Sequence, residues 1–468
     1  MMKHRKAFAI LAALVLLTAT GCGANKENAA SDAALTTAAP NALIQDNGDV
    51  EIAEEAEADL AGEAPAMADE AKSASIDSAR GESAGAAAEY GEAYSYSSVL
   101  NGLDGASAEM PAMDAPVPAP DEPIIETRPG EVGVLTAGEW RDHENWGFFT
   151  NLVNTDLIQF PSFGLDPCHR ISVTVTNAAG ESVPNAKVTL LDSDGAPIWH
   201  SVSDKNGIAY LFEANGKTGA TLTASLDGAE VSADVPASAE SDSQGAPALC
   251  SDKAVALTLD TAPVALPNTQ IMFIVDTTGS MGDEMLYLQS DFTAIAEEVG
   301  DAGTQYAALF YKDDGDEYIT HYEGFTNDVS LLKQRLNAER ANGGGDEPEA
   351  VAQAMTEAFV TENWQDDAVK VAFLIYDAPP HNGREGELQT AIERASELGI
   401  HLVPVVSSNG SRETELFGRA AAICTNGSYV FLTDDSGIGG SHLEPIIGDH
   451  EVEKLHDIIV RIIQNYKQ

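Results

Sequence analysis

The sequence predicts a doubly wound α/β domain with a mostly parallel sheet at its C-terminal end, preceded by a small β-sandwich and a disordered acidic N-terminal tether. Three observations support this prediction. Residues 268–468 alternate short apolar strands with helical patterns. Residues 170–262 alternate apolar with polar side chains between frequent turn motifs. Residues 23–134 contain too few large apolar side chains to offset their ordering entropy.

The elements expected in the C-terminal domain follow one another as strand, helix, strand. The expected strands are Ile271–Val275, Tyr306–Phe310, Val371–Tyr376, Leu402–Val406 and Tyr429–Leu432. The expected helices are Glu284–Val299, Val329–Leu336, Ala350–Val360, Leu388–Leu398 and Val452–Gln464. In sheets of this kind, ligands bind beyond the carboxyl ends of the strands.

The middle of the chain contains two segments for which the sequence predicts different structures. In residues 170–262, Ile171, Val173 and Val175 alternate with hydroxyl side chains, as in a half-buried strand. Residues 135–169 are rich in aromatic side chains, too many for a solvated linker, and we expect this segment to dock on the next domain. An exposed aromatic binding patch is the alternative.

The first 22 residues have the order of a secretion signal. Lys3, Arg5 and Lys6 precede the apolar run Ala7–Leu17, which is too short for a comfortable membrane span. The run ATGC, ending at Cys22, resembles the lipobox of bacterial lipoproteins, in which this cysteine carries lipid. The resemblance implies an extracytoplasmic protein held on the bacterial cell membrane by its lipid anchor alone. An ordinary cleaved signal peptide is the alternative.

Charge and cysteine content restrict the partners and the compartment. Seventy-five acidic and 25 basic residues give a formal charge of −50, which excludes nucleic acid and anionic lipid as direct partners. Cys168 and Cys250 flank the middle domain and could pair in an oxidising compartment, where closing so long a loop contributes roughly 4 kcal/mol. Cys424 lies in an apolar helical pattern and is expected to be a buried thiol.

Oxygen-bearing side chains follow two of the expected strands. Asp276 closes the first apolar strand, and Thr278 and Ser280 come after it at a spacing of two. Asp377 closes a second strand, and Asp346 lies in a glycine-rich loop that opens a helix. Carboxylates and hydroxyls brought together at one sheet edge are suited to Mg²⁺, Mn²⁺ or Ca²⁺ rather than to zinc or copper.

Two neighbouring polar features have plainer interpretations. The acidic run 313–317 resembles a calcium-binding loop but lacks the twelve-residue spacing, so we expect a hairpin turn there. We expect His381 to be a solvated loop residue rather than a group that supports the metal ligands.

The motifs DTTGSM at 276–281, GGGDEPEA at 343–350 and FLIYDAPPH at 373–381 together resemble the von Willebrand factor type A domain, and its extracellular-matrix, hemicentin-like members in particular. This resemblance implies a metal-ion-dependent adhesion site with Asp276, Thr278 and Ser280 as first ligands and Asp377 as the third-loop carboxylate. Asp346 stands near a position where many members have threonine. The resemblance also implies an open coordination position for an acidic side chain of a partner.

The run VTVTNAAGESVPNAKVTLLD in the middle domain resembles the carboxypeptidase regulatory-like, immunoglobulin-like sandwich. In that family the module is usually a spacer or an adhesive unit, so the resemblance implies no catalytic site in residues 170–262.

Three functions are compatible with these features. The first is a surface lipoprotein that binds a protein or matrix ligand, offering a carboxylate, through the divalent cation. The second is a structural assembly subunit in which the metal only stabilises loops. The third is a metal-assisted hydrolase, which the absence of P-loop, HExxH and GxSxG motifs disfavours. We expect no enzyme.

Overall fold

The computed structural model describes residues 130–155, 157–159, 163–214, 216–237, 249–345 and 347–467, which all belong to one compact unit of the chain. The predicted signal sequence with Cys22, the tether up to residue 129 and the candidate ligand Asp346 lie outside the described residues. Within the described ranges, every helix is too short or too polar to cross a membrane.

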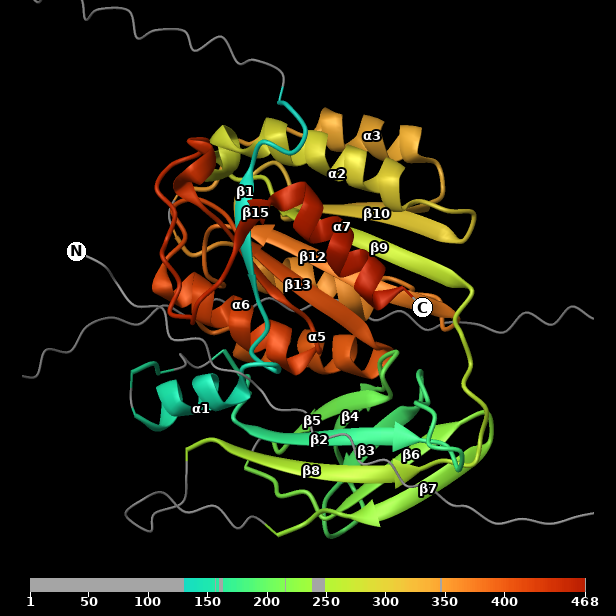
Figure 1. The fold of residues 1–468 in the computed structure, drawn as a ribbon. Helices are drawn as coiled ribbons and strands as arrows, with labels where there is room; N and C mark the ends of the chain where they lie inside the picture. Colours follow the sequence, from blue (N-terminus) through green and yellow to red (C-terminus); the bar gives the residue numbers. More distant parts are fainter. Residues whose placement is uncertain are drawn as a thin grey trace, which may run out of the picture. The chain divides into compact units, whose positions relative to one another are not determined.

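Eight strands form the sheet of the C-terminal domain, in the order β11-β10-β9-β12-β13-β14-β1-β15 (Figure 1). The parallel strands are β9 (Asn268–Asp276), β10 (Thr304–Tyr311), β12 (Ala368–Tyr376), β13 (Ile400–Val406) and β14 (Tyr429–Leu432). Antiparallel pairs form at both edges: β11 (Thr320–Thr326) pairs with β10 at one edge, and β1 (Thr136–Trp140) pairs with both β14 and β15 (Val452–Lys454) at the other. The predicted mostly parallel, doubly wound fold is therefore confirmed.

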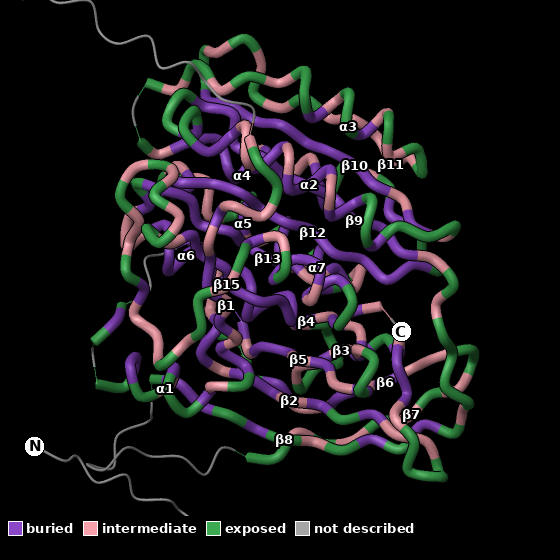
Figure 2. Tube along the Cα trace, turned by 45° about the horizontal axis from the view of Figure 1, so that its top comes forward, coloured by how far each residue is buried: buried purple, intermediate pink, exposed green. Residues whose placement is uncertain are grey.

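Helices cover both faces of this sheet. One face carries α2 (Met285–Val299), α3 (Val329–Ala338) and α7 (Leu455–Tyr466). The other carries α4 (Val351–Thr356) with its π-helical continuation Glu357–Thr361, α5 (Glu385–Leu398) and α6 (Arg412–Cys424). The central strands are consequently buried along nearly their whole length (Figure 2). Because both faces of these strands are buried, their sequences are continuous apolar runs and do not alternate between apolar and polar residues.

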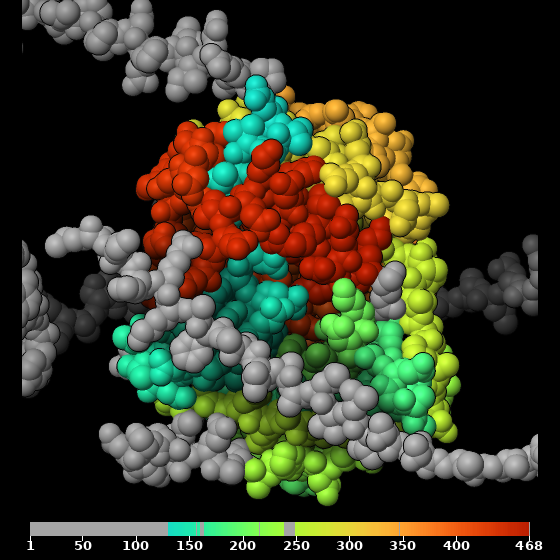
Figure 3. Space-filling view, viewed as in Figure 1, coloured from blue at the N-terminus to red at the C-terminus, as the bar shows by residue number. Residues whose placement is uncertain are grey.

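The edge of the sheet formed by β1 and β15 differs from the sequence prediction. Thr136–Trp140 does not dock on the middle domain but pairs with β14 on one side and β15 on the other. Figure 3 shows this segment, in cyan, lying against the red C-terminal residues. The expected helix Val452–Gln464 begins instead as strand β15, because its first three residues pair with β1.

The middle domain consists of two β-sheets, with strand orders β5-β2-β8 and β4-β3-β6-β7. Its strands are β2 (His169–Thr176), β3 (Lys187–Leu191), β4 (Pro197–Val202), β5 (Ile208–Phe212), β6 (Thr221–Leu226), β7 (Ala229–Asp234) and β8 (Ser251–Thr258). The alternating side chains of Ile171, Val173 and Val175 all point into the shared core. Because β1 precedes this domain and β9 follows it, the β-sandwich is an insertion between two strands of the C-terminal sheet.

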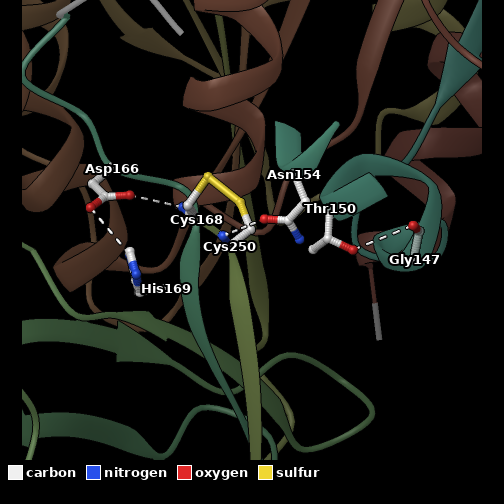
Figure 4. Close-up of a disulfide and its surroundings, with 7 residues drawn as sticks. All are labelled: Gly147, Thr150, Asn154, Asp166, Cys168, His169 and Cys250. Carbon is white, nitrogen blue, oxygen red and sulfur yellow. Dashed lines mark hydrogen bonds and ion pairs between the residues drawn. A yellow bond between two sulfur atoms is a disulfide. The ribbon is translucent and has the colours of Figure 1, made fainter. Parts of the chain in front are cut away.

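A disulfide and the short helix α1 (Trp146–Asn154) lie where the chain enters the β-sandwich. Cys168 and Cys250 are joined immediately before the parallel neighbours β2 and β8, with a Cα–Cα distance of 4.4 Å (Figure 4). The backbone N–H of Cys250 donates to Asn154 of α1 at 3.1 Å. Cys424 on α6 is a buried free thiol.

Buried polar contacts fasten the insertion to the C-terminal domain. Directly after β1, the carboxylate of Asp142 accepts two hydrogen bonds from the fully buried guanidinium of Arg419 on α6, at 2.7 and 2.9 Å. On β4, the indole N–H of Trp199 donates to the hydroxyl of Ser396 on α5 at 3.1 Å, and that hydroxyl donates to the backbone carbonyl of His200. The two domains therefore share one continuous core rather than a flexible junction.

Candidate metal centre

The loop after β9 gathers three oxygen-bearing side chains. Asp276 is fully buried, and its Oδ1 accepts hydrogen bonds from the backbone N–H and the hydroxyl of Thr278 at 2.8 and 2.7 Å. The hydroxyl of Thr278 lies 3.2 Å from that of Ser280. The other Asp276 oxygen, Oδ2, has no hydrogen-bond partner among the described residues. One carboxylate oxygen of Asp276 is therefore hydrogen-bonded within the loop, while the other has no hydrogen-bond partner among the described residues.

Asp377 brings a second carboxylate to the same edge from the end of β12, which pairs directly with β9. Its side chain is buried, and neither carboxylate oxygen has a hydrogen-bond partner in the described part of the chain. The hydroxyl of Ser280 lies close enough to favour the ionised form of Asp377, although it makes no hydrogen bond to it. The loops after β9 and β12 therefore converge, as expected for adjacent parallel strands.

Neither Asp276 nor Asp377 forms an ion pair in the described part of the chain. Burial, followed by the charge of Asp377, raises the pKa of Asp276 to about 7, against the hydrogen bonds from Thr278. Burial also raises the pKa of Asp377 to about 6, with the charges of Glu284 and Glu347 adding to the effect. Buried acids with no compensating cation are costly to ionise.

Glu349, which the sequence interpretation left without a role, is a third buried carboxylate at this edge. Burial raises its pKa to about 8, and the charge of Asp276 is the next cause. Its Oε2 has no partner among the described residues, and its backbone N–H donates to the carbonyl of Pro379 at 3.1 Å. A Cβ on Gly344 would lie 2.9 Å from the Glu349 carboxylate and 3.1 Å from Thr278, so only glycine allows the loop this close.

The acidic run is the predicted hairpin turn, between β10 and β11, but it also reaches this edge. Asp316 accepts from the backbone N–H of Gly344 at 2.7 Å, which fixes the glycine-rich loop. Asp313 lies 2.6 Å from Nε2 of His381. His381 is therefore paired within the loop cluster and is not simply solvated, contrary to our expectation.

A buried lysine fixes two of the loops together. The ammonium of Lys312, at the end of β10, donates to the carbonyl of Thr277 at 2.8 Å and to the carbonyl and side chain of Asn342 at 2.7 and 2.8 Å. Burial lowers its pKa. Lys312 thus connects the loop after β9 with the glycine-rich loop, and the sequence carried no motif that would have singled it out.

These residues fit a hard divalent cation. Within the described ranges, no three His, Cys, Asp or Glu side chains stand close enough to hold a metal by themselves, so hydroxyls would have to complete the set. Asp276, Thr278, Ser280 and Asp377 supply such a mixed set, and unpartnered carboxylate oxygens at its centre would gain the positive charge they lack. Carboxylate and hydroxyl oxygens are the donors that Mg²⁺, Mn²⁺ and Ca²⁺ prefer.

Comparison with known proteins agrees with the sheet and its loops. Residues 270–437 match the family described as von Willebrand factor A domain, so the C-terminal part of the chain contains such a domain, as its motifs predicted. β1, β15 and the whole of α7 lie outside the matched residues. No curated protein matches the chain.

Among solved structures, the chain is similar to the crystal structure of the conserved hypothetical protein BatB from Bacteroides thetaiotaomicron. The two are 13% identical over 42% of this chain and 98% of that one, with a TM-score of 0.32. A likeness this weak bears on neither the fold nor the function.

Proposed function

We propose that this protein is a cell-surface lipoprotein that binds a protein or matrix ligand through a divalent cation in its von Willebrand factor A domain. Asp276, Thr278, Ser280 and Asp377 would hold the cation, with Asp346 as a further ligand. The observation that supports this most directly is the set of buried carboxylate oxygens without partners at the ends of β9 and β12.

The ligand's contribution follows from the chemistry of the cation. Mg²⁺ favours six oxygen ligands and usually keeps some as water. Four side chains leave positions that a carboxylate of the partner can take, and its negative charge would be drawn to the metal rather than to the acidic protein surface. In this proposal the cation supplies binding and no catalysis.

Metal binding can be tested by titrating Mg²⁺ or Mn²⁺ calorimetrically into the wild-type protein and into Asp276→Ala and Asp377→Ala. Both variants should lose at least about tenfold in affinity, the equivalent of 1.4 kcal/mol. Asp260→Ala, an exposed carboxylate outside the site, is the matched control and should bind as the wild type does. Unchanged affinity in Asp276→Ala would reject the proposed ligand set.

Glu349 favours a second candidate, in which the metal stabilises loops within a structural subunit. A third buried carboxylate could neutralise the cation without any acid from a partner. A crystal structure with bound Mn²⁺ separates the two functions. A water molecule in one coordination position supports ligand binding, whereas a sphere filled by oxygens of the protein itself supports the structural role.

A further inference from the structure

A large cavity lies between the β-sandwich and the C-terminal domain, away from the candidate metal centre. Its volume is about 700 Å³, which is in the range of small-molecule sites. The sandwich contributes β3, β4 and the turn at 203–206, and the C-terminal domain contributes the start of β12, the end of α5 and the last residues of α7. Such a junction between two domains is a common place for a small-molecule site.

The cavity gathers lysines in a protein that is otherwise strongly acidic. Lys187, Lys205 and Lys370 all line it, and none of them has a carboxylate within ion-pair distance in the described part of the chain. Acidic residues outnumber basic ones by 75 to 25 over the whole sequence. Three lysines without acidic partners in one cavity therefore run against the composition of the chain.

Most of the carboxylates in the lining are already engaged. Glu144 is paired with Arg141 at 3.3 Å, and Glu397 with Arg394 at 2.6 Å. Asp204 accepts from the backbone N–H groups of residues 206 and 208. Asp204 and Asp366 form no ion pair in the described part of the chain, so the three unpaired lysines of the lining outnumber its two unpaired carboxylates.

Lys370 is the most constrained of the three lysines. It is 6% exposed, and its ammonium donates one hydrogen bond, to the backbone carbonyl of Ala368 at 3.1 Å. Burial lowers its pKa to about 8; the charge of Asp366, which also lines the cavity, acts in the opposite direction, and the charge of Lys187 lowers the pKa further. This ammonium has three donors and one protein acceptor, and no carboxylate among the described residues lies within ion-pair distance of it.

We propose that this cavity binds a small organic anion, whose carboxylate or phosphate group is held by Lys370 together with Lys187 and Lys205. An oxyanion would supply further acceptors for Lys370 and balance the excess of unpaired lysines over unpaired carboxylates in the lining. This site is separate from the metal centre. Lys370 lies near the start of β12 and Asp377 follows its end, about 23 Å away at roughly 3.3 Å per residue.

The test is calorimetric titration of inorganic phosphate, citrate and glucose 6-phosphate into the protein, in buffer of constant ionic strength without divalent cations. At least one of these anions should bind saturably, while neutral glucose should not. Binding by the phosphates alone assigns a phosphate site, and binding by citrate alone assigns a carboxylate site. Lack of saturable binding by all three anions overturns the proposal, as does equal binding of glucose.

Three lysine variants locate the site. Lys370→Met and Lys187→Gln should each weaken anion binding by at least about tenfold. Lys333→Met, at an exposed position on α3, is the matched control and should bind like the wild type. If Lys370→Met does not fold, Lys187→Gln decides, because that side chain is exposed. Binding unaffected by Lys187→Gln, or weakened equally by Lys333→Met, also overturns the proposal.

Discussion

Replacing Asp276 by asparagine should stabilise the metal-free protein while abolishing its response to a cation. The asparagine oxygen can keep both hydrogen bonds that Thr278 gives to Oδ1. The substitution removes a buried negative charge that lies near Asp377 and whose second oxygen has no hydrogen-bond partner among the described residues. Asparagine leaves a neutral amide nitrogen in place of the unpaired oxygen, so the gain is the difference between an unpaired charged atom and an unpaired neutral one, about 2 kcal/mol.

The expected gain in the free energy of unfolding without metal is therefore about 2 kcal/mol. For a unit of this size, each kcal/mol shifts the melting temperature by about 2–4 °C, which predicts an increase of about 4–8 °C. With cation at about one hundred times its dissociation constant, the wild type should gain about 2.7 kcal/mol. The Asp276→Asn variant should gain nothing.

Differential scanning fluorimetry with EDTA and with saturating Mg²⁺ measures both quantities on the same samples. Asp260→Asn, an exposed carboxylate, should match the wild type under both conditions. The reasoning fails if Asp276→Asn melts below the wild type in EDTA, because the carboxylate would then be stabilised by the protein itself. A Mg²⁺-induced shift in the variant equal to that of the wild type would remove Asp276 from the ligand set.

Three further predictions concern other parts of the chain. Asp142→Ala removes the bidentate partner of the buried Arg419 guanidinium, which keeps its ion pair with Glu415 at 3.2 Å, and should cost about 1.5–3 kcal/mol in urea unfolding; a loss below about 1 kcal/mol contradicts this. Burial lowers the pKa of His401 to about 4, so its contribution to stability is full above the unfolded value near 6.5 and is lost as the pH falls toward 4. His401→Phe should therefore reduce the loss of unfolding free energy between pH 7 and 4.5 by about 2–3 kcal/mol, and an unchanged loss refutes the assignment. Cys22→Ser should move the protein from the membrane pellet to the supernatant, and unchanged partitioning contradicts the lipid anchor.

The parallel strands, and the positions of Asp276 and Asp377 at the ends of two of them, were predictable because their signals are local. A strand buried on both faces must be apolar throughout, so a carboxylate that ends such a run marks the sheet edge. Asp276 and Asp377 both end runs of this kind, and the structure places them on adjacent strands. The helical patterns were readable for the same reason, since each helix buries a periodic stripe.

What the sequence could not predict depends on contacts between distant residues. The hydroxyl of Thr136 donates a hydrogen bond to the carbonyl of Thr433, 297 positions later. The five residues of β1 mix polar and apolar side chains, and this pattern does not indicate which strand they pair with. Glu349 sits in a motif that was recognised, but its burial results from the approach of three other loops. The sequence around Arg419 is that of an ordinary charged position on a helix, and only the structure shows that Asp142 pairs with it.

The insertion changes how the middle domain should be understood. From its sequence, residues 170–262 predict a spacer or adhesive unit, which would be joined to its neighbours by a linker at each end. Instead, the chain enters the sandwich from β1 and leaves it into β9, two strands of one sheet. Gly399, which follows the last residue of α5, adopts a positive φ. A Cβ atom added to Gly399 would lie only 3.0 Å from the Cβ of Val202 on β4, so the helix end and the sandwich are in close contact.

Such contacts fix the sandwich at the amino ends of the central strands, while the candidate ligands lie beyond their carboxyl ends. A partner bound at the metal edge would consequently be presented on the side of the sheet opposite to the sandwich. Because β12 runs from Lys370 in the cavity to the residue before Asp377, one rigid strand connects the two proposed sites. Ligands at the two ends can influence each other only if this strand or its covering helices have a second arrangement, and independent binding of Mg²⁺ and of the anion is therefore the expected result.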